Sequence, residues 1–326
     1  MKALALLSGG LDSTLAVKLI QEQGISIIAL NFTSPFCLCG KNGCGAVGVA
    51  KQLKLPIKIL PVGTDYLQVV RNPKHGYGRN MNPCIDCRIF MLRKAKKYAA
   101  EIGASFLFTG EVLNQRPMSQ YKKALDIIEK ETNLKDKILR PLSAELLPET
   151  EAEREGWVNR EKLLGIKGRS RKKQMELAKE LDLKDYPCPS GGCLLTYKEF
   201  ADKIRDLFNH KKNIRIKDIN LLKIGRHFRL GKNKIIVGRN ESENEQLEKM
   251  KEKNDYYFEV PNCGSPITLL QGPKTKKAIE KAAGLTLRYS DEKTEKARVS
   301  YGTNKRNQHI IAVRMNDHEI EKLRIE

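Results

Sequence analysis

The most constraining feature of this chain is the hexapeptide Ser8–Ser13, Ser-Gly-Gly-Leu-Asp-Ser, which follows a short apolar run at residues 3–7. A continuous apolar run of this length is typical of a parallel strand that is covered on both faces. Residues 14–23 then carry apolar side chains at helical spacing, and Gly24 ends the expected helix. Glycines in such a turn let backbone N–H groups approach an anion, and the N-terminus of the helix favours negative charge. The sequence therefore predicts an anion-binding loop between a first strand and a first helix.

Asp12 is the unusual member of this loop, because a carboxylate beside a bound anion requires a cation such as Mg²⁺ between it and a phosphate. The pattern resembles the pyrophosphate loop of the ATP pyrophosphatase superfamily, whose members split ATP into AMP and pyrophosphate. It lacks the Gly-Lys-Ser/Thr ending of the P-loop that serves γ-phosphate transfer. The resemblance implies that Asp12 is a catalytic residue that anchors Mg²⁺. It also implies that the whole loop binds ATP, through Ser8, Gly9, Gly10, Leu11, Asp12 and Ser13.

Charge and cysteine content restrict the class of protein further. The 326 residues include 60 Lys and Arg against 39 Asp and Glu, and this formal net charge of +21 favours a nucleic-acid partner. The apolar runs are shorter than the ~20 residues that a membrane helix needs, and the N-terminus shows no signal-peptide pattern. We therefore expect a cytoplasmic protein with no membrane partner, whose eight cysteines are reduced rather than paired in structural disulfides.

Residues 1–130 alternate apolar runs with amphipathic segments, which predicts a parallel sheet with right-handed crossovers. Thr109-Gly110-Glu111 lies at the carboxyl end of an expected strand, where such sheets bind their ligands. This tripeptide should face the same crevice as the Ser8–Ser13 loop. Strands are expected at 3–7, 25–31, 57–62 and 105–109, and helices at 14–23, 46–53 and 88–102.

The pattern changes after residue 210, where short β-rich pieces alternate with glycines. Residues 211–326 hold 26 Lys and Arg against 16 Asp and Glu, so this part is basic. Strands are expected at 221–224, 227–230 and 234–237, and helices at 171–181, 199–209, 242–253 and 274–283. The predicted fold is α/β, with a parallel sheet of the adenine-nucleotide α-hydrolase (PP-loop) type and a second, smaller basic α+β domain. The expected domain bounds are 1–205 and 212–326.

Cys84 and Cys87 form a CxxC motif at the start of an expected helix, while Cys188 and Cys193 lie in a Pro- and Gly-rich segment. In a reduced α/β protein such a motif is a redox pair, a pair of metal ligands or a pair of small packing residues. A bend at Gly191-Gly192 would direct Cys193, rather than Cys188, towards the crevice. Thiolates at Cys84, Cys87 and Cys193 could then hold an iron–sulfur cluster with one open iron, or a catalytic zinc with an open position.

Cys37, Cys39 and Cys44 form another cysteine group, in a Gly-rich loop. Their spacing is similar to that of a zinc knuckle, but the group lacks a fourth ligand. A structural zinc and a flexible loop over the nucleotide site both stay open as interpretations. Cys263 is expected to be a packing residue.

Four separated motifs, taken in order, resemble those of the tRNA 4-thiouridine synthetases over residues 1–200. They are the pyrophosphate loop Ser8–Ser13, the cysteine pair Cys84–Cys87, the segment Thr109–Gln120 and the segment Ile138–Leu142. Asn82-Pro83-Cys84 is also similar to the corresponding segment of the 2-thiouridylases that modify the tRNA wobble position. Gly225–Leu247 resembles the RNA-binding module of NFACT proteins. This module is expected to bind tRNA in place of the N-terminal tRNA-binding module of typical 4-thiouridine synthetases.

The resemblance implies an ATP-dependent tRNA sulfurtransferase that adenylates a uridine carbonyl and replaces its oxygen with sulfur. The Thr109–Gln120 segment favours 4-thiouridine, whereas Asn82-Pro83-Cys84 leaves 2-thiouridine open. Sulfur would be delivered by a 4Fe–4S cluster on Cys84, Cys87 and Cys193, which the number of thiols favours. In the alternative, Cys87 and Cys193 work as a persulfide and resolving pair, so both are catalytic in either case. The sulfur donor would be sulfide or a cysteine desulfurase, and homodimers are common among tRNA thiolases of this type.

Further site residues are expected at strand ends and in basic clusters. Contacts with nucleotide or uridine are expected from Asn31, Phe32, Gly110, Glu111 and Gln115. Contacts with tRNA phosphates are expected from Lys167, Arg169, Arg171, Lys172, Lys173, Arg226 and Arg239.

Two other classes stay open at this point. The first is a ligase similar to the 7-cyano-7-deazaguanine synthases, which share the loop and bind zinc through cysteines; a free nucleobase product would identify it. The second is a non-catalytic RNA-binding protein with a relic ATP loop, which would form no pyrophosphate.

Overall fold

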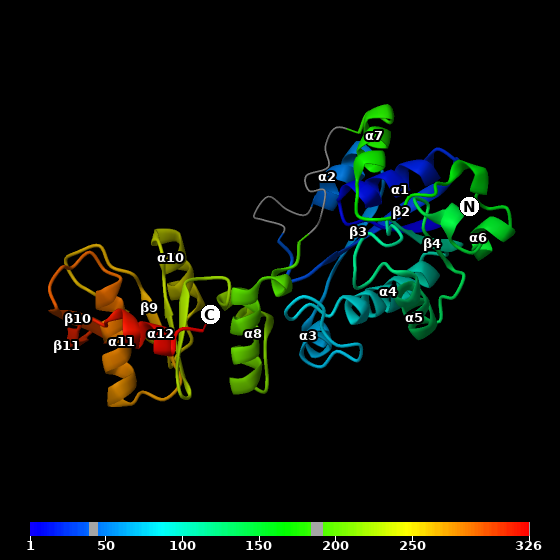
Figure 1. The fold of residues 1–326 in the computed structure, drawn as a ribbon. Helices are drawn as coiled ribbons and strands as arrows, with labels where there is room; N and C mark the ends of the chain where they lie inside the picture. The colour runs from blue at the N-terminus through cyan, green and yellow to red at the C-terminus, as the bar shows by residue number, and fades with distance from the viewer. Residues whose placement is uncertain (39–44, 184–191, 326) are drawn as a thin grey trace. The chain divides into compact units, whose positions relative to one another are not determined.

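The computed structural model describes residues 1–38, 45–183 and 192–325, which form two compact units, Met1–Thr196 and Tyr197–Glu326 (Figure 1). The division falls earlier than the expected bound at residue 205. The reason is that helix α8 (Lys198–His210) packs within the second unit, where its Asp206 accepts hydrogen bonds from Arg229. The predictions for Cys39, Cys44 and Cys188 lie outside the described residues.

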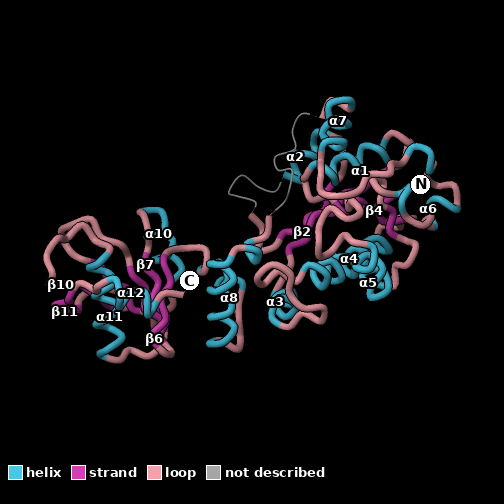
Figure 2. The backbone as a smooth tube through the Cα atoms, viewed as in Figure 1, coloured by secondary structure: helices cyan, strands magenta, loops and turns pink. Residues whose placement is uncertain are grey.

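The first unit contains a five-stranded sheet in which every strand pairs in parallel with its neighbours. The order is β3-β2-β1-β4-β5, and the expected parallel α/β sheet is confirmed. Figure 2 shows these strands in magenta at the centre of the unit. Their bounds are β1 (Lys2–Leu6), β2 (Ser26–Thr33), β3 (Ile57–Pro61), β4 (Phe106–Thr109) and β5 (Ile138–Leu139).

Helices cover both faces of this sheet because the central strand is apolar on both sides. Ala3 and Ala5 of β1 pack into the core of one face, and Leu4 packs into the core of the other. The first face is covered by α1 (Leu11–Gln21), α2 (Gly45–Gln52) and α7 (Lys172–Glu180), and the second by α4 (Cys84–Glu101) and α5 (Lys122–Thr132) (Figure 1). The shorter helices are α3 (Thr64–Arg71), α6 (Glu151–Arg154), η1 (Ala144–Leu146), η2 (Arg160–Lys162) and η3 (Leu194–Thr196).

The strand order creates a crevice at one defined place. The chain leaves β1 towards β2 on one side, and β4 then joins β1 on the other side, so the order reverses at β1. Open α/β sheets bind their ligands outside the carboxyl ends of the strands at such a reversal. The connections that follow β1 and β4 therefore lie on either side of the expected ligand position.

The second unit contains a six-stranded sheet in the order β11-β10-β8-β9-β7-β6, in which every pairing is antiparallel. Ile235 and Val237 of the central strand β7 pack on one face, and Ile236 packs on the other. The strand bounds are β6 (Arg226–Leu230), β7 (Asn233–Val237), β8 (Tyr256–Glu259), β9 (Thr268–Gln271), β10 (Lys296–Gly302) and β11 (Gln308–Val313).

Helices also cover both faces of this second sheet, which confirms the expected α+β class. The helices are α9 (Ile216–Leu221), α10 (Glu241–Met250), α11 (Lys276–Arg288) and α12 (Asp317–Leu323). The strand expected at residues 221–224 is wrong: Leu221 is the last residue of α9, and residues 222–224 form the turn that follows it. Its apolar residues Leu221 and Ile224 enter the core beside Leu247 of α10, so their hydrophobicity marked burial rather than a strand.

Two other findings concern individual helices. Helix α4 begins at Cys84, so the CxxC motif forms its first turn instead of preceding it. No helix among the described residues is long and apolar enough to cross a membrane.

Candidate nucleotide and thiol site

The Ser8–Ser13 loop is held in shape by its own backbone and hydroxyl groups. Gly9 has a φ of +79°, and a Cβ atom there would lie 2.2 Å from the backbone nitrogen of Ala46, so glycine is required. The Ser13 hydroxyl donates to the carbonyl of Gly10 at 2.9 Å, and the Oγ atoms of Ser8 and Ser13 are 3.1 Å apart. Because Gly10 is the N-cap of α1, the loop presents the amino end of that helix to the crevice.

The carboxyl end of β4 lies directly against this loop. A Cβ atom on Gly110 would come within 2.5 Å of the Ser13 backbone nitrogen, so the two segments approach as closely as backbones allow. A small cavity of about 50 Å³ between them is lined by residues of both segments. These include Ser8, Gly10, Asp12 and Ser13 from the loop, and Thr109, Gly110 and Glu111 after β4. The prediction that both segments face one crevice is confirmed.

The close approach at Gly110 leads to a testable expectation. We expect Gly110→Ala to push the end of β4 away from α1, because overpacking of this kind costs about 1–3 kcal/mol. If that cost falls on the crevice, ATP affinity decreases by about 5- to 150-fold, as measured by titration calorimetry. Gly48→Ala is the matched control, because a Cβ atom there meets nothing within 4 Å. Unchanged ATP affinity in Gly110→Ala would show that the approach does not shape the nucleotide site.

Asp12 is surrounded by donors from the connection after β4 and from the start of α7. Its carboxylate accepts hydrogen bonds from Gln115 at 2.6 Å and from Gln174 of α7 at 3.3 Å. The Arg171 Nε atom lies 3.8 Å from the same carboxylate. Burial raises the pKa of Asp12, and these neighbours act in the opposite direction. Gln115 therefore contacts the loop carboxylate, and its contact with nucleotide or uridine stays a prediction. Gln174 was not predicted, and Arg171, which was assigned to tRNA, lies beside Asp12.

Glu111 is fully enclosed and holds two arginines. Its carboxylate lies 3.3 Å from the Arg88 Nε atom and accepts a hydrogen bond from Arg140 Nε at 3.1 Å. Burial acts to raise the pKa of Glu111, but Arg88 and Arg140 outweigh it, so the pKa lies below its usual range. Glu111 thus connects α4, the end of β4 and the end of β5. Its direct contact with nucleotide or uridine stays a prediction.

Four cysteines line a second cavity, of about 240 Å³, at the carboxyl ends of β1 and β2. Cys84 and Cys87 come from the first turn of α4. Cys193 comes from the segment before η3, and Cys37 comes from the segment after β2. The three predicted ligands are therefore brought to one cavity. Cys37 joins them, although its sequence position had suggested either a structural zinc or a flexible loop over the nucleotide site.

Burial disfavours the thiolate form of three of the thiols in this cavity. Burial raises the pKa of Cys84 and of Cys87, and it raises that of Cys193 to about 12. The Tyr66 hydroxyl donates a hydrogen bond to Cys87 Sγ at 3.0 Å. Within the described part of the chain, no three His, Cys, Asp or Glu side chains are grouped closely enough to hold one metal ion.

The cavity of about 50 Å³ beside the Ser8–Ser13 loop, called the nucleotide cavity below, shares a wall with the cavity of about 240 Å³ that the cysteines line, called the thiol cavity. Leu6, Ser8, Arg88 and Arg116 line both. Burial and the neighbouring Arg88 lower the pKa of Arg116, although part of its side chain is exposed to solvent. An anion bound at the loop would therefore lie beside two arginines and next to the thiols.

The end of β2 borders the thiol cavity through Asn31 and Phe32. The Asn31 amide donates to the carbonyl of Leu7 at 2.8 Å, and its Oδ1 atom has no hydrogen-bond partner within the described residues. The side chain therefore fixes β2 to the start of the loop. Contact of Asn31 and Phe32 with adenine stays a prediction.

The residues predicted to bind tRNA fall into two groups. The side chains of Lys167, Arg169, Lys172 and Lys173 are exposed on the first unit. In the second unit, Arg226 stacks on the Tyr289 ring at 4.5 Å, and Arg239 pairs with Glu243. These two arginines already have partners within the protein, and their contact with RNA stays a prediction.

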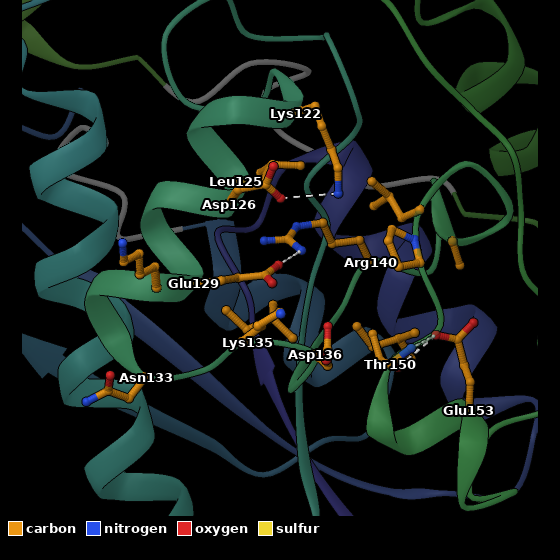
Figure 3. Close-up of a pocket in the computed structure, with 16 residues that line it drawn as sticks. Lys122, Leu125, Asp126, Glu129, Asn133, Lys135, Asp136, Arg140, Thr150 and Glu153 are labelled. Carbon is orange, nitrogen blue, oxygen red and sulfur yellow. Dashed lines mark hydrogen bonds and ion pairs between the residues drawn. The ribbon is translucent and has the colours of Figure 1, made fainter.

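A separate cavity of about 550 Å³ lies beside α5 and the segments around β5 and α6 (Figure 3). Its charges balance, and Figure 3 shows Lys122 pointing towards Asp126 and Arg140 towards Glu129. The charged lining residues are Lys122, Lys130, Lys135, Arg140, Asp126, Glu129, Asp136 and Glu153. None of the predicted nucleotide or thiol residues lines this cavity, so we do not assign the reaction to it.

Comparison with known proteins agrees with the division of the chain into two units. Residues 1–145 match the family described as thiamine biosynthesis protein (ThiI), and residues 225–324 match the NFACT protein RNA binding domain. The two matches fall in the two units, and we call the matched segments the ThiI-type and the NFACT-type domain for this similarity. The resemblance inferred from the sequence motifs is therefore confirmed for both segments.

Curated relatives match the ThiI-type domain. A probable tRNA sulfurtransferase of Ureaplasma parvum serovar 3 is 34% identical over 117 residues, 35% of this chain and 30% of the relative. A tRNA-specific 2-thiouridylase of Pelobacter propionicus is 34% identical over 117 residues, 34% of this chain and 33% of the relative. The chain thus spans about a third of the length of these relatives. A crystal structure of a 4-thiouridine synthetase in complex with RNA and ATP is 24% identical over 68% of this chain and 52% of that chain, with a TM-score of 0.39.

Proposed function

We propose that the protein is an ATP-dependent tRNA sulfurtransferase that adenylates a uridine carbonyl and replaces its oxygen with sulfur. The observation that carries the proposal is the shared wall, because Ser8 of the anion-binding loop also lines the cavity that holds the cysteines. ATP activates the carbonyl oxygen and sulfur attacks the carbon that bears this oxygen, so the two sites must adjoin. The names of the curated relatives, a tRNA sulfurtransferase and a tRNA 2-thiouridylase, support the same reaction class.

The loop residues account for the first step. Backbone N–H groups at Gly9 and Gly10 and the amino end of α1 hold the phosphates. The uridine oxygen attacks the α-phosphorus, pyrophosphate leaves, and the oxygen becomes part of a phosphate-ester leaving group. Asp12 and the phosphates would hold Mg²⁺, which offsets their negative charge. Arg116 lies where it can stabilise the charge of the departing pyrophosphate.

The thiol cavity fits an iron–sulfur cluster better than a single ion. Each thiolate of a cluster binds a different iron, so cluster ligands lie further apart than ligands that share one ion. Cys84, Cys87 and Cys193 line one cavity, yet no three metal-binding side chains among the described residues are close enough for one ion. When bound, a 4Fe–4S cluster supplies an iron that is open to an external sulfur ligand. Sulfide or a cysteine desulfurase would be the sulfur source.

The uridine position is part of the proposal. We favour 4-thiouridine because the Thr109–Gln120 segment resembles that of the 4-thiouridine synthetases, and 2-thiouridine is the alternative. The NFACT-type domain and the exposed basic run of residues 167–173 are the proposed tRNA contacts.

The test is a reconstituted reaction under anaerobic conditions with tRNA, ATP, Mg²⁺, sulfide and iron-loaded protein. We expect one AMP for each thionucleoside, which is identified after digestion of the tRNA by mass spectrometry. A 2-thiouridine product would change the assigned atom and leave the reaction class intact. Pyrophosphate release that requires no tRNA, with a modified free base as product, would replace the proposal with a nucleobase ligase.

The exposed basic run provides a separate prediction about tRNA binding. We expect a triple variant with glutamine at Lys167, Lys172 and Lys173 to bind tRNA more weakly. The slope of log K against log salt should decrease by up to about three units, because each phosphate contact releases counterions. A matched variant with glutamine at the exposed Lys51, Lys54 and Lys58 should keep the slope of the native protein. Equal slopes in both variants would show that the run is a solvated surface.

A further inference from the structure

Cys37 and Cys193 face each other as partners in an isolated antiparallel bridge. The hydrogen bonds around the bridge come from the residues that flank them: Leu194 N–H donates to Phe36 O at 2.8 Å, and Leu38 N–H donates to Gly192 O at 3.4 Å. Cys37 and Cys193 are therefore the non-hydrogen-bonded pair between two backbone contacts. In this arrangement the Cα atoms are ~4.5 Å apart and the side chains lie closer than in a hydrogen-bonded pair.

This geometry satisfies the main requirement for a disulfide, since bonded cysteines usually have Cα atoms ~4.4–6.8 Å apart. Both thiols line the same cavity of about 240 Å³ and both residues are partly exposed. A diffusible oxidant or thiol can therefore reach them. Gly192 is packed against Leu38, where a Cβ atom would lie 2.1 Å from Leu38 Cδ1, so the two segments are in direct contact beside the pair.

The other thiols of the cavity are placed differently. Cys84 and Cys87 lie three residues apart in the first turn of one helix, and the Cys87 sulfur accepts a hydrogen bond from Tyr66. Of the described cysteines, Cys37 and Cys193 alone are backbone bridge partners.

We propose that Cys37 and Cys193 form a reversible dithiol–disulfide pair, whose oxidation withdraws Cys193 from the thiols that face the nucleotide crevice. The two thiols lose two protons and two electrons and one S–S bond forms. With diamide as the oxidant, the N=N bond takes up both electrons and both protons and becomes a hydrazine. A dithiol such as dithiothreitol reverses the step by thiol–disulfide exchange. The consequence for sulfur transfer rests on the proposed function, whereas the pairing itself does not.

The first test uses full-length metal-free protein, treated anaerobically with diamide, alkylated, digested without reduction and mapped by mass spectrometry. We expect a peptide that links Cys37 to Cys193 as the main cross-link, and we expect dithiothreitol to remove it. Cys37→Ser should lose this cross-link, whereas the control Cys263→Ser should keep it, because Cys263 lies in the second unit. Cys193 that stays alkylated after diamide, or that pairs with any other cysteine, would overturn the proposal.

The second test compares metal-free protein with iron-loaded protein at the same diamide concentration. We expect at least a tenfold lower yield of the Cys37–Cys193 peptide in the loaded protein, because Cys193 is then a ligand. Equal yields of the peptide, with the visible absorption of the cluster retained, would refute the claim that Cys193 serves both in the disulfide and as an iron ligand. Failure of the tRNA reaction would contradict the proposed function and would leave the peptide map of the pair unchanged.

Discussion

Asp12→Ala is expected to abolish ATP-dependent sulfur transfer and leave the first unit folded. In the proposed function the carboxylate lies in the loop that would hold the phosphates, so its removal would deprive Mg²⁺ of an anchor there. Loss of one group that stabilises transition-state charge costs about 100- to 1,000-fold in rate, so we expect a decrease of at least that size. The rate of AMP formation in a single turnover with tRNA measures the effect.

Folding of the Asp12 variant must be checked independently. Burial raises the pKa of Asp12, which means that the native state disfavours its charge, so alanine is not expected to lower the unfolding midpoint by much. Glu22→Ala is the matched control. Glu22 is the exposed residue that follows the end of α1, the helix that contains Asp12, and it pairs with Lys18 at 3.4 Å. Full activity in a folded Asp12→Ala protein would contradict the assignment of the loop to ATP.

The second large effect is expected at the cysteines. Protein reconstituted without oxygen should contain about four irons and four inorganic sulfides for each chain, with the brown colour of a 4Fe–4S cluster. Cys84→Ala, Cys87→Ala and Cys193→Ala should each lose this iron and the tRNA reaction, because two thiolates do not hold a cluster. Iron and sulfide analysis and visible spectra measure the first loss, and nucleoside mass spectrometry measures the second.

Two variants serve as controls for the cysteine set. Cys188→Ala is expected to keep iron and activity, because we assign Cys193 rather than Cys188 as the third cluster ligand. Cys188 lies outside the described residues. Cys37→Ser is expected to keep iron in reduced protein, because Cys37 is the oxidation partner rather than a ligand. Loss of iron in Cys188→Ala would change the ligand set. Activity of iron-free protein in air, with a persulfide on Cys87, would rule out the cluster.

Much of the fold could be predicted because its strands are continuous apolar runs. Residues 3–7 and 57–62 were recognised in this way, and the structure places strands there as β1 and β3. The same rule failed at residues 221–224, since a short apolar run does not distinguish a strand from the buried end of a helix. The start of α4 was placed four residues too late, because the helix begins at Cys84 directly after its N-cap residue Pro83.

The site was predictable only where its residues form local motifs. The Ser8–Ser13 loop and the CxxC motif are contiguous, so their chemistry is visible in the sequence. Arg116 lies inside the Thr109–Gln120 segment but was not singled out there, and Gln174 belongs to no motif. They reach the loop through the packing of the connection after β4 and of α7. Cys37 was grouped with its neighbours in sequence, whereas its bridge partner Cys193 lies 156 residues further along the chain.

The origin of the cysteines also determines when the thiol cavity can exist during synthesis. Cys37 follows the second strand, Cys84 and Cys87 open α4, and Cys193 lies at the very end of the first unit. Contacts between segments so far apart form late, because the loop between them must be closed first. The Ser8–Ser13 loop is among the first residues to be synthesised. The thiol cavity stays incomplete until its last lining residues, Gly192 and Cys193, have been made. Under the proposed function, a cluster that uses Cys193 would be assembled only after the whole first unit has been made.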